Sequence, residues 1–371
     1  MRAEQLQTLH EAGMKVLQGT GVVFQDHETV RLFASHGFPV DGWRVFIPPD
    51  AVAAALSTAP GAFALEARAP GRDLVVGTGD LVSTNACGAA RVAEGAAARP
   101  LTREDLRAWI RLCHMAPNLD MLGFSVATSG GSTRQDLLHS VYDSVTLTDK
   151  FLDYPLSEPE HLQVSLTILE ILYGADWASR PRLLVILNCV SPLLFPAHVC
   201  ATLRLMAHLN QPLGITPAAL GGMTGPVTVA GLLVQQHAEA LAGLVLVQLI
   251  RPGCPFLYGG FSSSTSMSTG AFALGSPEFW GVAAATVELA NHVGLPVRAG
   301  AGGTDSHLLD MQAGVETALG LSLVIERGVD LIMHGSGAIS SLNAVSFEKL
   351  ITFCSNLSMQ NHLNEYGPLR Y

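Results

Sequence analysis

The feature that most constrains how this chain can fold is an alternation of strand-like and helix-like runs that begins near residue 120. The strand-like runs are short and apolar, as strands buried on both faces are, and they cover 121–126, 151–154, 183–187, 213–216, 256–259, 297–300 and 331–334. The segments between them have helical length and cover 161–173, 197–209, 227–250, 277–293 and 311–327. Strands that alternate with helices predict an α/β fold with a parallel sheet.

The loops of this chain favour a sheet that closes into a barrel over an open sheet. Small residues, as Gly-Gly, Ser-Gly or Thr-Gly pairs, follow several of the strand-like runs, which is typical of a TIM-like (β/α)8 barrel with its site at the carboxyl ends of the strands. A doubly wound sheet is the alternative, but no GxGxxG follows a first strand. Only seven strand-like runs occur from residue 120 onward. We therefore expect a barrel that is incomplete at its C-terminus, unless one strand is hidden elsewhere.

The first hundred residues have a different pattern of apolar and polar residues. Apolar spacing predicts a helix over 6–17, Asp26 can cap a second helix, and Pro48 begins a third. Short alternating runs between 61 and 100 predict a small β-rich segment, and Thr102 caps a helix that extends to Met115. We interpret 1–100 as an N-terminal helical and β-rich cap and 101–371 as the barrel.

Composition excludes several classes of protein. Hydrophobic residues make up 49% of the chain and charged residues 14%, so a large core can form and disorder is excluded. No run of eighteen apolar residues predicts a membrane span, and the net charge of −10 without Lys/Arg-rich runs disfavours nucleic-acid binding. None of the six cysteines forms a CxxC pair, so no metal site is predicted. A cytoplasmic location with reduced thiols is expected.

Polar side chains at the ends of the strand-like runs are the candidates for a site. We expect Asn188, Thr216, Tyr258, Arg298 and His334 to converge at one end of the barrel. A strand arginine is costly unless it faces the lumen and is paired, and Asp305 or Asp310 is the natural partner. We assign catalytic roles to His334, Arg298 and Asp305, with His334 as a candidate general acid. A structural ion pair and a simply hydrogen-bonded histidine are the plainer alternatives.

Two loops can contribute to binding. Thr224 can cap the helix after strand 213–216, with Pro226 in its first turn, which would direct free N–H groups at the barrel mouth. Tyr258 and Phe261 can face a cation through their ring quadrupoles. The plainer alternatives are an ordinary capped loop and aromatic packing at the top of the barrel.

Several segments, in order from about residue 5 to 350, resemble the trimethylamine methyltransferase family. The main ones are 221–231, 238–243, 248–255 and 302–316, with shorter ones at 10–13, 148–150, 188–193 and 346–350. The resemblance implies a barrel enzyme that takes a methyl group from an amine and passes it to the cobalt of a separate corrinoid protein. The chain itself would bind no cofactor. Because only standard residues occur through the barrel segments, it resembles the branch without pyrrolysine, whose members include enzymes for glycine betaine and similar quaternary amines.

The C-terminus departs from the family pattern. Family members usually continue further, and here 351–357 replaces an expected acidic helix, while the ending 366–371 looks unlike the family. We expect low stability or a homo-oligomer that covers the open edge of the barrel. One alternative function is a non-catalytic amine-binding remnant of the family. Another is an aldolase or lyase that uses Arg298 and His334, which is disfavoured because Lys150 is the only lysine near a strand end.

Overall fold

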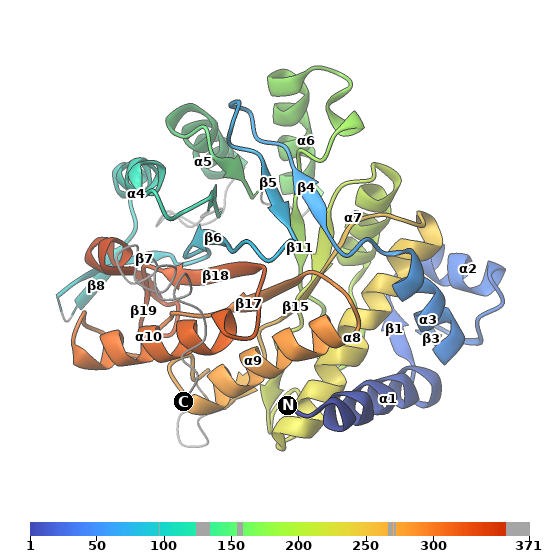
Figure 1. Cartoon of the computed structure of the whole chain (residues 1–371). Helices are drawn as coiled ribbons and strands as arrows, with labels where there is room; N and C mark the ends of the chain where they lie inside the picture. The colour runs from blue at the N-terminus through green and yellow to red at the C-terminus, as the bar shows by residue number, and fades with distance from the viewer. Residues whose placement is uncertain (96, 124–133, 154–158, 266–269, 271, 354–371) are drawn as a thin grey trace.

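The computed structural model describes the chain except residues 96, 124–133, 154–158, 266–269, 271 and 354–371. Eight parallel strands form one curled sheet with helices on its outside (Figure 1). In their order across the sheet they are β10 (Phe151–Leu152), β9 (Met121–Leu122), β6 (Val82–Asn85), β18 (Leu331–Ser336), β17 (Val297–Gly300), β15 (Phe256–Gly260), β13 (Leu213–Ile215) and β11 (Val185–Leu187). A parallel bridge between Asp153 and Leu184 joins the two ends of the sheet. The prediction of a TIM-like barrel is confirmed.

The eighth strand lies in the segment that the sequence analysis assigned to the cap. Strand β6 pairs with β18 through Val82 and Leu331, and with β9 through Thr84 and Met121. Of the two alternatives for the eighth strand, the structure confirms that it lies elsewhere in the chain. The prediction that the barrel begins at residue 101 is therefore wrong. The reason is that β6 is polar but entirely buried. Its polar groups are satisfied inside the protein, because the Ser83 N–H and hydroxyl both donate to Asp120, so its hydropathy does not reveal it.

The helices that separate the strands lie where the sequence predicted them, except one over 134–147 that was not predicted. They are α4 (Arg103–Met115), α5 (Arg134–Leu147), α6 (Pro159–Tyr173), α7 (Ala197–His208), α8 (Val229–Ile250), α9 (Pro277–His292) and α10 (Met311–Ile325). Thr102 caps α4 as expected. Helix α8 is long and apolar enough to cross a membrane by length and composition, yet most of it is buried inside the protein. It packs against helices and strands on several sides, which is how the core helix of a folded domain is placed.

The N-terminal segment has the helical and β-rich character that was predicted. It contains α1 (Ala3–Gly19), α2 (His27–Ser35), which Asp26 caps, and α3 (Pro49–Thr58). A small sheet combines β1 (Val22–Phe24), β2 (Val40–Asp41), β3 (Arg44–Val45) and β12 (Leu194–Phe195). The hairpin of β4 (Phe63–Leu65) and β5 (Leu74–Val76) joins the apolar interior of the barrel, where Phe63 and Leu65 cluster with Leu184 and Leu257.

Short elements complete the carboxyl end of the barrel. Four of them form one sheet, β7 (Arg91–Glu94), β8 (Ala97–Pro100), β19 (Ala338–Ile339) and β20 (Ala344–Val345). Two more, β14 (Leu220–Gly221) and β16 (Ser263–Ser264), pair above β13 and β15. The altered segment after residue 353, with Cys354 and the ending 366–371, lies outside the described residues. The expected homo-oligomer was argued from a missing strand that the structure supplies, and the oligomeric state stays a prediction.

Candidate functional site

A cavity of about 180 Å³ opens where the barrel strands end. It contains five of the residues that the sequence proposed for the site and four that it did not. Those nine lining residues are Asn188, Thr216, Phe261, Arg298, His334, Asp153, Ile186, Ala218 and Met333. Five of them follow β10, β11, β13 and β15, and the other four lie within β11, β17 and β18. The cavity is therefore at the carboxyl end of the barrel, which is where TIM-barrel enzymes hold their sites.

Strand register decides which side chains enter this cavity. Two residues that lie opposite each other in paired strands point to the same face of the sheet, whereas successive residues along one strand point to opposite faces. Arg298 lies opposite Gly259, and Tyr258 lies opposite Val297. Arg298 therefore points into the barrel and Tyr258 points outward, toward the helices. The Tyr258 hydroxyl lies 2.8 Å from Nδ1 of His237 on α8. The predicted place of Tyr258 at the barrel mouth is wrong.

Arg298 is a buried cation whose charge has no fixed partner in the described part of the chain. Its side chain is 3% exposed, and both Nε and Nη1 lack a hydrogen-bond acceptor. The guanidinium carbon lies 5.3 Å from the centre of the Phe261 ring. Burial lowers the pKa of Arg298 to about 10, so it remains protonated at neutral pH. The site therefore presents unsatisfied N–H donors to whatever occupies the cavity.

The predicted carboxylate partners of Arg298 lie elsewhere. Asp305 accepts hydrogen bonds from the Leu274 N–H at 2.9 Å and from the Ser341 hydroxyl at 2.6 Å, so it organises loops outside the cavity. Asp310 caps α10 by accepting from the Ala313 N–H. The prediction that Asp305 pairs with Arg298 at the site is wrong, because its carboxylate is committed to these loop contacts.

The carboxylate that does reach the cavity is Asp153, directly after β10. Burial raises its pKa to about 7, and the charge of Arg298 acts in the opposite direction. No ion pair joins Asp153 to Arg298 within the described residues, and the two charges act on each other across the cavity without direct contact. The cavity thus contains one permanent cation and one carboxyl group close to half-ionised at neutral pH.

His334 occupies a bulged position near the end of β18. Its φ of 69° is left-handed, and the pairing of β18 with β6 shifts register between Ile332 and Ser336. Such bulges re-aim side chains next to functional sites. Nδ1 accepts a long hydrogen bond from the Cys87 N–H, at 3.5 Å, which leaves the ring proton on Nε2. Burial, then the charge of Arg298, lowers the pKa of His334 to about 3. At neutral pH the ring is an uncharged donor and lacks the proton that a general acid would give.

Thr224 lies in a turn and does not begin the helix. The Leu220 N–H donates to its hydroxyl at 2.9 Å, which closes a turn over 220–225. Helix α8 begins later, at Val229, and Thr228 is its cap, accepting from the Gly231 N–H. The prediction that Thr224 caps this helix at the barrel mouth is wrong, because the turn after β14 delays the helix start by four residues.

Two buried charged residues support the loops around the cavity, and the sequence analysis gave neither of them a role. Glu239 accepts from the Ser191 hydroxyl and the Leu193 N–H, both at 2.8 Å, and so fixes the loop that carries Asn188. Lys349 donates to the carbonyl oxygens of Gly302 and Gly335. No local sequence pattern indicates a role for these two residues. The feature that could have indicated one is that they lie in 238–243 and 346–350, two of the segments that resemble the methyltransferase family.

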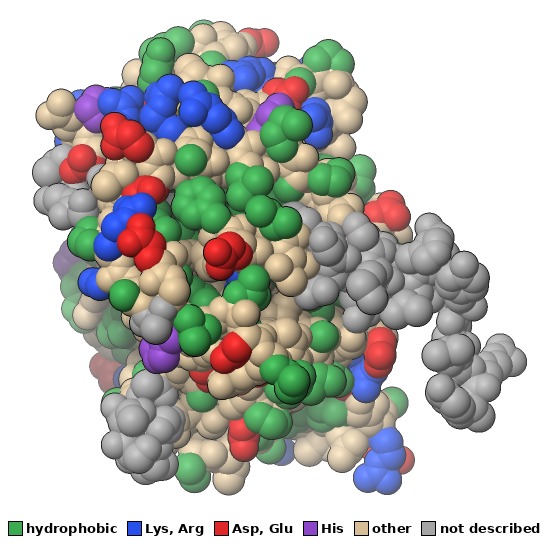
Figure 2. All heavy atoms as spheres, turned by 90° about the vertical axis from the view of Figure 1, so that its left-hand side faces the viewer, with side chains coloured by type: hydrophobic (Ala, Val, Ile, Leu, Met, Phe, Trp, Pro, Cys, Tyr) green, Lys and Arg blue, Asp and Glu red, His purple; other side chains and the backbone are tan. Residues whose placement is uncertain are grey.

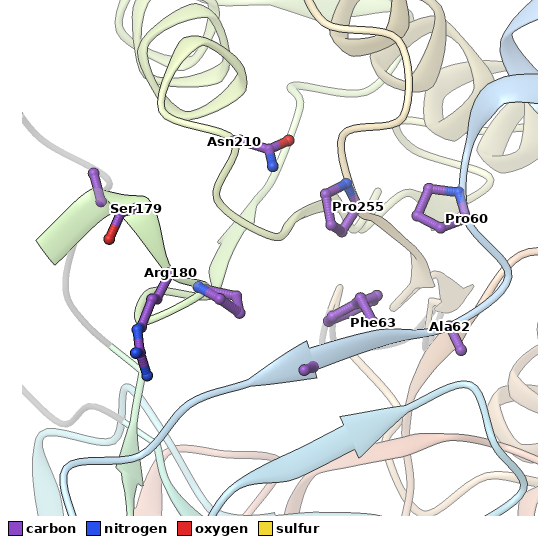
Figure 3. A pocket seen from close by; sticks show the side chains of 10 residues that line it. Pro60, Ala62, Phe63, Ser179, Arg180, Asn210 and Pro255 are labelled. Atoms are coloured by element: carbon purple, nitrogen blue, oxygen red, sulfur yellow. The ribbon is translucent and has the colours of Figure 1, made fainter.

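A second cavity lies at the other end of the barrel and holds fewer reactive groups. Figure 3 shows it between Phe63 of β4 and the segments that enter the strands, with Asn210 and Pro255 on its rim. Its volume is about 290 Å³. Arg180 is the charged residue in its lining, and this arginine already pairs with Glu66. Because the amino ends of barrel strands serve stability, we assign the functional site to the smaller cavity.

Comparison with known proteins identifies the family of the chain. A family model described as trimethylamine methyltransferase (MTTB) matches residues 1–368. The glycine betaine methyltransferase of Desulfitobacterium hafniense (strain Y51) is 31% identical over 357 residues, which cover 94% of this chain and 74% of that protein. The proline betaine:corrinoid methyltransferase of Eubacterium limosum is 28% identical over 361 residues, covering 93% and 73%. The trimethylamine methyltransferase of Methanosarcina thermophila is 29% identical over 378 residues, covering 99% and 78%.

A solved structure is similar in fold. The crystal structure of the monomethylamine methyltransferase of Methanosarcina barkeri superposes with a TM-score of 0.58 and covers 96% of this chain and 73% of that one. At 10% identity this likeness concerns the barrel architecture alone.

Proposed function

Because the chain belongs to the trimethylamine methyltransferase family, we propose that its substrate is a quaternary amine that also carries a carboxylate, and that the methyl acceptor is the corrinoid of a partner protein. Two of the relatives described above are named for betaines, which have this chemistry. A third is named for trimethylamine, which has no carboxylate. The choice between a betaine and a simple methylamine therefore depends on the residues of the site.

The observation that carries the proposal is the unsatisfied guanidinium of Arg298. Two buried N–H groups without acceptors cost free energy, about 1–3 kcal/mol each, until a ligand supplies oxygen atoms. A carboxylate matches the forked donors of arginine and forms strong charge-assisted hydrogen bonds. Trimethylamine would leave the guanidinium unpaired and would add a second positive charge to the cavity. The geometry therefore favours a betaine over a simple methylamine.

The chemistry of a quaternary amine fits the groups that the cavity offers. When the N–CH₃ bond breaks, its electron pair stays on nitrogen and a neutral amine leaves, so no proton has to be supplied. An uncharged His334 is compatible with such a reaction. The reduced corrinoid of the partner supplies the nucleophilic electron pair. The residues of this chain bind the carboxylate, hold the ammonium in one orientation and keep water out.

The face around the cavity is suited to a protein partner. Large apolar side chains are exposed in the segments that follow barrel strands. Val227, before α8, is 78% exposed, and Met311, the first residue of α10, is 85% exposed. Figure 2 views the side of the molecule toward which β17 and β18 run, and there hydrophobic side chains lie among charged ones of both signs. Exposed apolar surface of this kind often marks an interaction site. The same proposal includes a cytoplasmic location, where reducing conditions keep corrinoid and thiols reduced.

Ligand binding tests the substrate class directly. We expect glycine betaine to raise the melting temperature, because a ligand at a hundred times its Kd adds roughly 2.7 kcal/mol to the free energy of unfolding. Choline and tetramethylammonium, which lack the carboxylate, should shift it far less. Arg298→Gln should abolish the response to betaine, whereas Arg251→Gln, at an exposed arginine away from the cavity, should preserve it. Equal binding of choline and glycine betaine, or an unchanged response in Arg298→Gln, would overturn the proposal.

Turnover tests the reaction itself. We expect purified protein with glycine betaine to methylate reduced cobalamin, followed by its visible spectrum. A protein that binds betaine with no methyl transfer to cobalamin or to a corrinoid protein would be an amine-binding module instead.

A further inference from the structure

We infer that Asp153 is the residue that recognises the quaternary ammonium, and that it releases a proton when the cation binds. This inference rests on the proposed function, because it assigns the second charge of a betaine to a second group in the same cavity. It makes Asp153 a specificity-determining residue and couples substrate binding to pH.

The position of Asp153 makes its carboxyl group a fixed part of the cavity wall. Its backbone forms the bridge to Leu184 that joins the two ends of the barrel sheet, and its N–H donates to the carbonyl of Leu122 at 2.9 Å. The carboxyl group and Arg298 both line the same small cavity. A ligand that places a carboxylate on Arg298 therefore has its other end within the space that Asp153 faces.

A quaternary ammonium leaves few ways to be recognised. It has no N–H to donate, so only opposite charge and aromatic faces attract it. Phe261, the aromatic residue of the cavity lining, already has close neighbours: the Phe272 ring lies 5.2 Å away, the His334 ring 5.1 Å and the Arg298 guanidinium 5.3 Å. Because Arg298 already lies over the Phe261 ring, the ammonium group of the substrate is poorly placed there as a second cation. We therefore assign the cation-binding role that was predicted for Phe261 to Asp153.

Protonation follows from the groups that face Asp153. In the part of the chain that the structure describes, these are Arg298 on β17, His334 on β18 and Cys87 after β6. Burial raises the pKa of Asp153 to about 7, so close to half of the molecules carry its proton at neutral pH. A permanent cation beside the carboxyl group favours the ionised form, so the proton leaves as the substrate enters. Burial holds His334 uncharged down to about pH 3 and raises the pKa of the Cys87 thiol, so neither of these groups supplies a proton near pH 7.

The inference gives a quantitative expectation for affinity. If only the ionised form of Asp153 binds the cation, a free pKa near 7 makes binding roughly tenfold weaker at pH 6 than at pH 8. The number of protons released per betaine bound should be close to one at pH 6, about one half at pH 7 and small at pH 8. The carboxylate of betaine stays ionised throughout this range and contributes no proton.

Titration calorimetry with glycine betaine tests this expectation. Measuring the binding enthalpy in phosphate and in Tris buffer at each pH gives the number of protons released, because the two buffers differ in ionisation enthalpy. Asp153→Asn, which has nearly the same shape, should abolish proton release and make the affinity independent of pH. Asp176→Asn, at an exposed carboxylate, should leave both unchanged.

The outcomes separate this inference from the proposed function. Betaine binding by the unmodified protein without proton release at pH 6 would overturn the role of Asp153 and leave the substrate class intact. Proton release that persists in Asp153→Asn would do the same. Failure to bind betaine at any pH would overturn both. Because the buffer comparison uses the unmodified protein, the inference stays testable even if Asp153→Asn does not fold.

Discussion

The ammonium nitrogen of Lys349 lies 3.1 Å from the carbonyl oxygen of Gly335, the residue that follows His334. The same ammonium donates to the carbonyl of Gly302, beyond the end of β17. Lys349 is 1% exposed and burial lowers its pKa to about 7. One side chain thus ties together the ends of the two strands that carry Arg298 and His334, so it acts on the site by position and not by contact with the substrate.

Replacing this lysine should loosen the cavity and destabilise the protein. Lys349→Met removes the ammonium donor from the Gly335 carbonyl and leaves the Gly302 carbonyl with the longer hydrogen bond from the Thr317 hydroxyl, at a total cost of about 1–3 kcal/mol. We expect a lower melting temperature and weaker binding of glycine betaine by calorimetry. Lys15→Met, at an exposed lysine of α1, is the matched control and should change neither. A Lys349→Met protein with unaltered melting and affinity would show that the strand ends are held by other contacts.

The sequence and the structure place the side chain of Tyr258 differently, so a substitution of Tyr258 tests which placement is right. The sequence placed it at the mouth, whereas its hydroxyl reaches His237 on α8. Tyr258→Phe should therefore leave betaine affinity unchanged while lowering the free energy of unfolding by about 1–3 kcal/mol, because it leaves the buried Nδ1 of His237 without its partner. Calorimetry and urea denaturation measure the two effects. A large loss of affinity with little loss of stability would restore Tyr258 to the site.

The sequence predicted the fold better than the site for a physical reason. Buried parallel strands and amphipathic helices have a periodic signature, and every strand-like run from residue 120 onward corresponds to a strand. The sequence analysis missed strand β6 because the strand is polar. Its polar residues form hydrogen bonds with partners distant in sequence, such as Asp120, and a local sequence pattern does not show such partners. The direction of Tyr258 depends on register, and a one-residue change moves a side chain to the other face of the sheet.

The partner of a buried charge is equally hard to read from a sequence. Arg298 was correctly expected to face the lumen, because a strand arginine has few other places. The carboxylate that shares its cavity is Asp153, 145 residues earlier in the chain, across the barrel sheet. Asp305 was nearer in sequence, but its carboxylate accepts hydrogen bonds from a loop N–H and a serine hydroxyl. Closeness along the chain was a poor guide, since a barrel brings all its strand ends to one place.

Acid should destabilise the protein through His237. This ring is fully buried, with His10 Nδ1 at 2.9 Å from its Nε2, and burial lowers its pKa to about 3. Above pH 6.5 the ring is neutral in both the folded and the unfolded chain, so it has no effect on stability. Below 6.5 only the unfolded chain takes the proton, so stability falls as the pH falls, by up to about 1.4 kcal/mol per unit for this group.

Urea denaturation at pH 7.5, 6.0 and 5.0 measures this slope. His334 contributes in the same direction, because its pKa is also lowered to about 3. Asp153, whose pKa burial raises to about 7, acts in the opposite direction, because its carboxyl group takes up a proton in the folded chain first. Relative to the unmodified protein, His237→Gln should therefore lose the part of the slope that corresponds to one proton. His208→Gln, at the end of α7, is a control that should keep the full slope. An identical slope in His237→Gln would mean that the ring is protonated in the folded protein.

The exposed apolar residues around the cavity should matter for the partner and not for the substrate. Met311 begins α10 and is 85% exposed, which is a high exposure for a large apolar side chain. Met311→Glu introduces a charge that would have to be desolvated under a docked protein, so methyl transfer to a corrinoid protein should slow severalfold. Free reduced cobalamin needs no docking surface, and its methylation by the same variant should proceed at the unmodified rate. Ile171→Glu, on α6 and 76% exposed, is the matched control for an apolar residue on another helix. Equal slowing with free cobalamin would place Met311 in the catalytic cavity, and no slowing with either acceptor would place the docking surface elsewhere on the barrel.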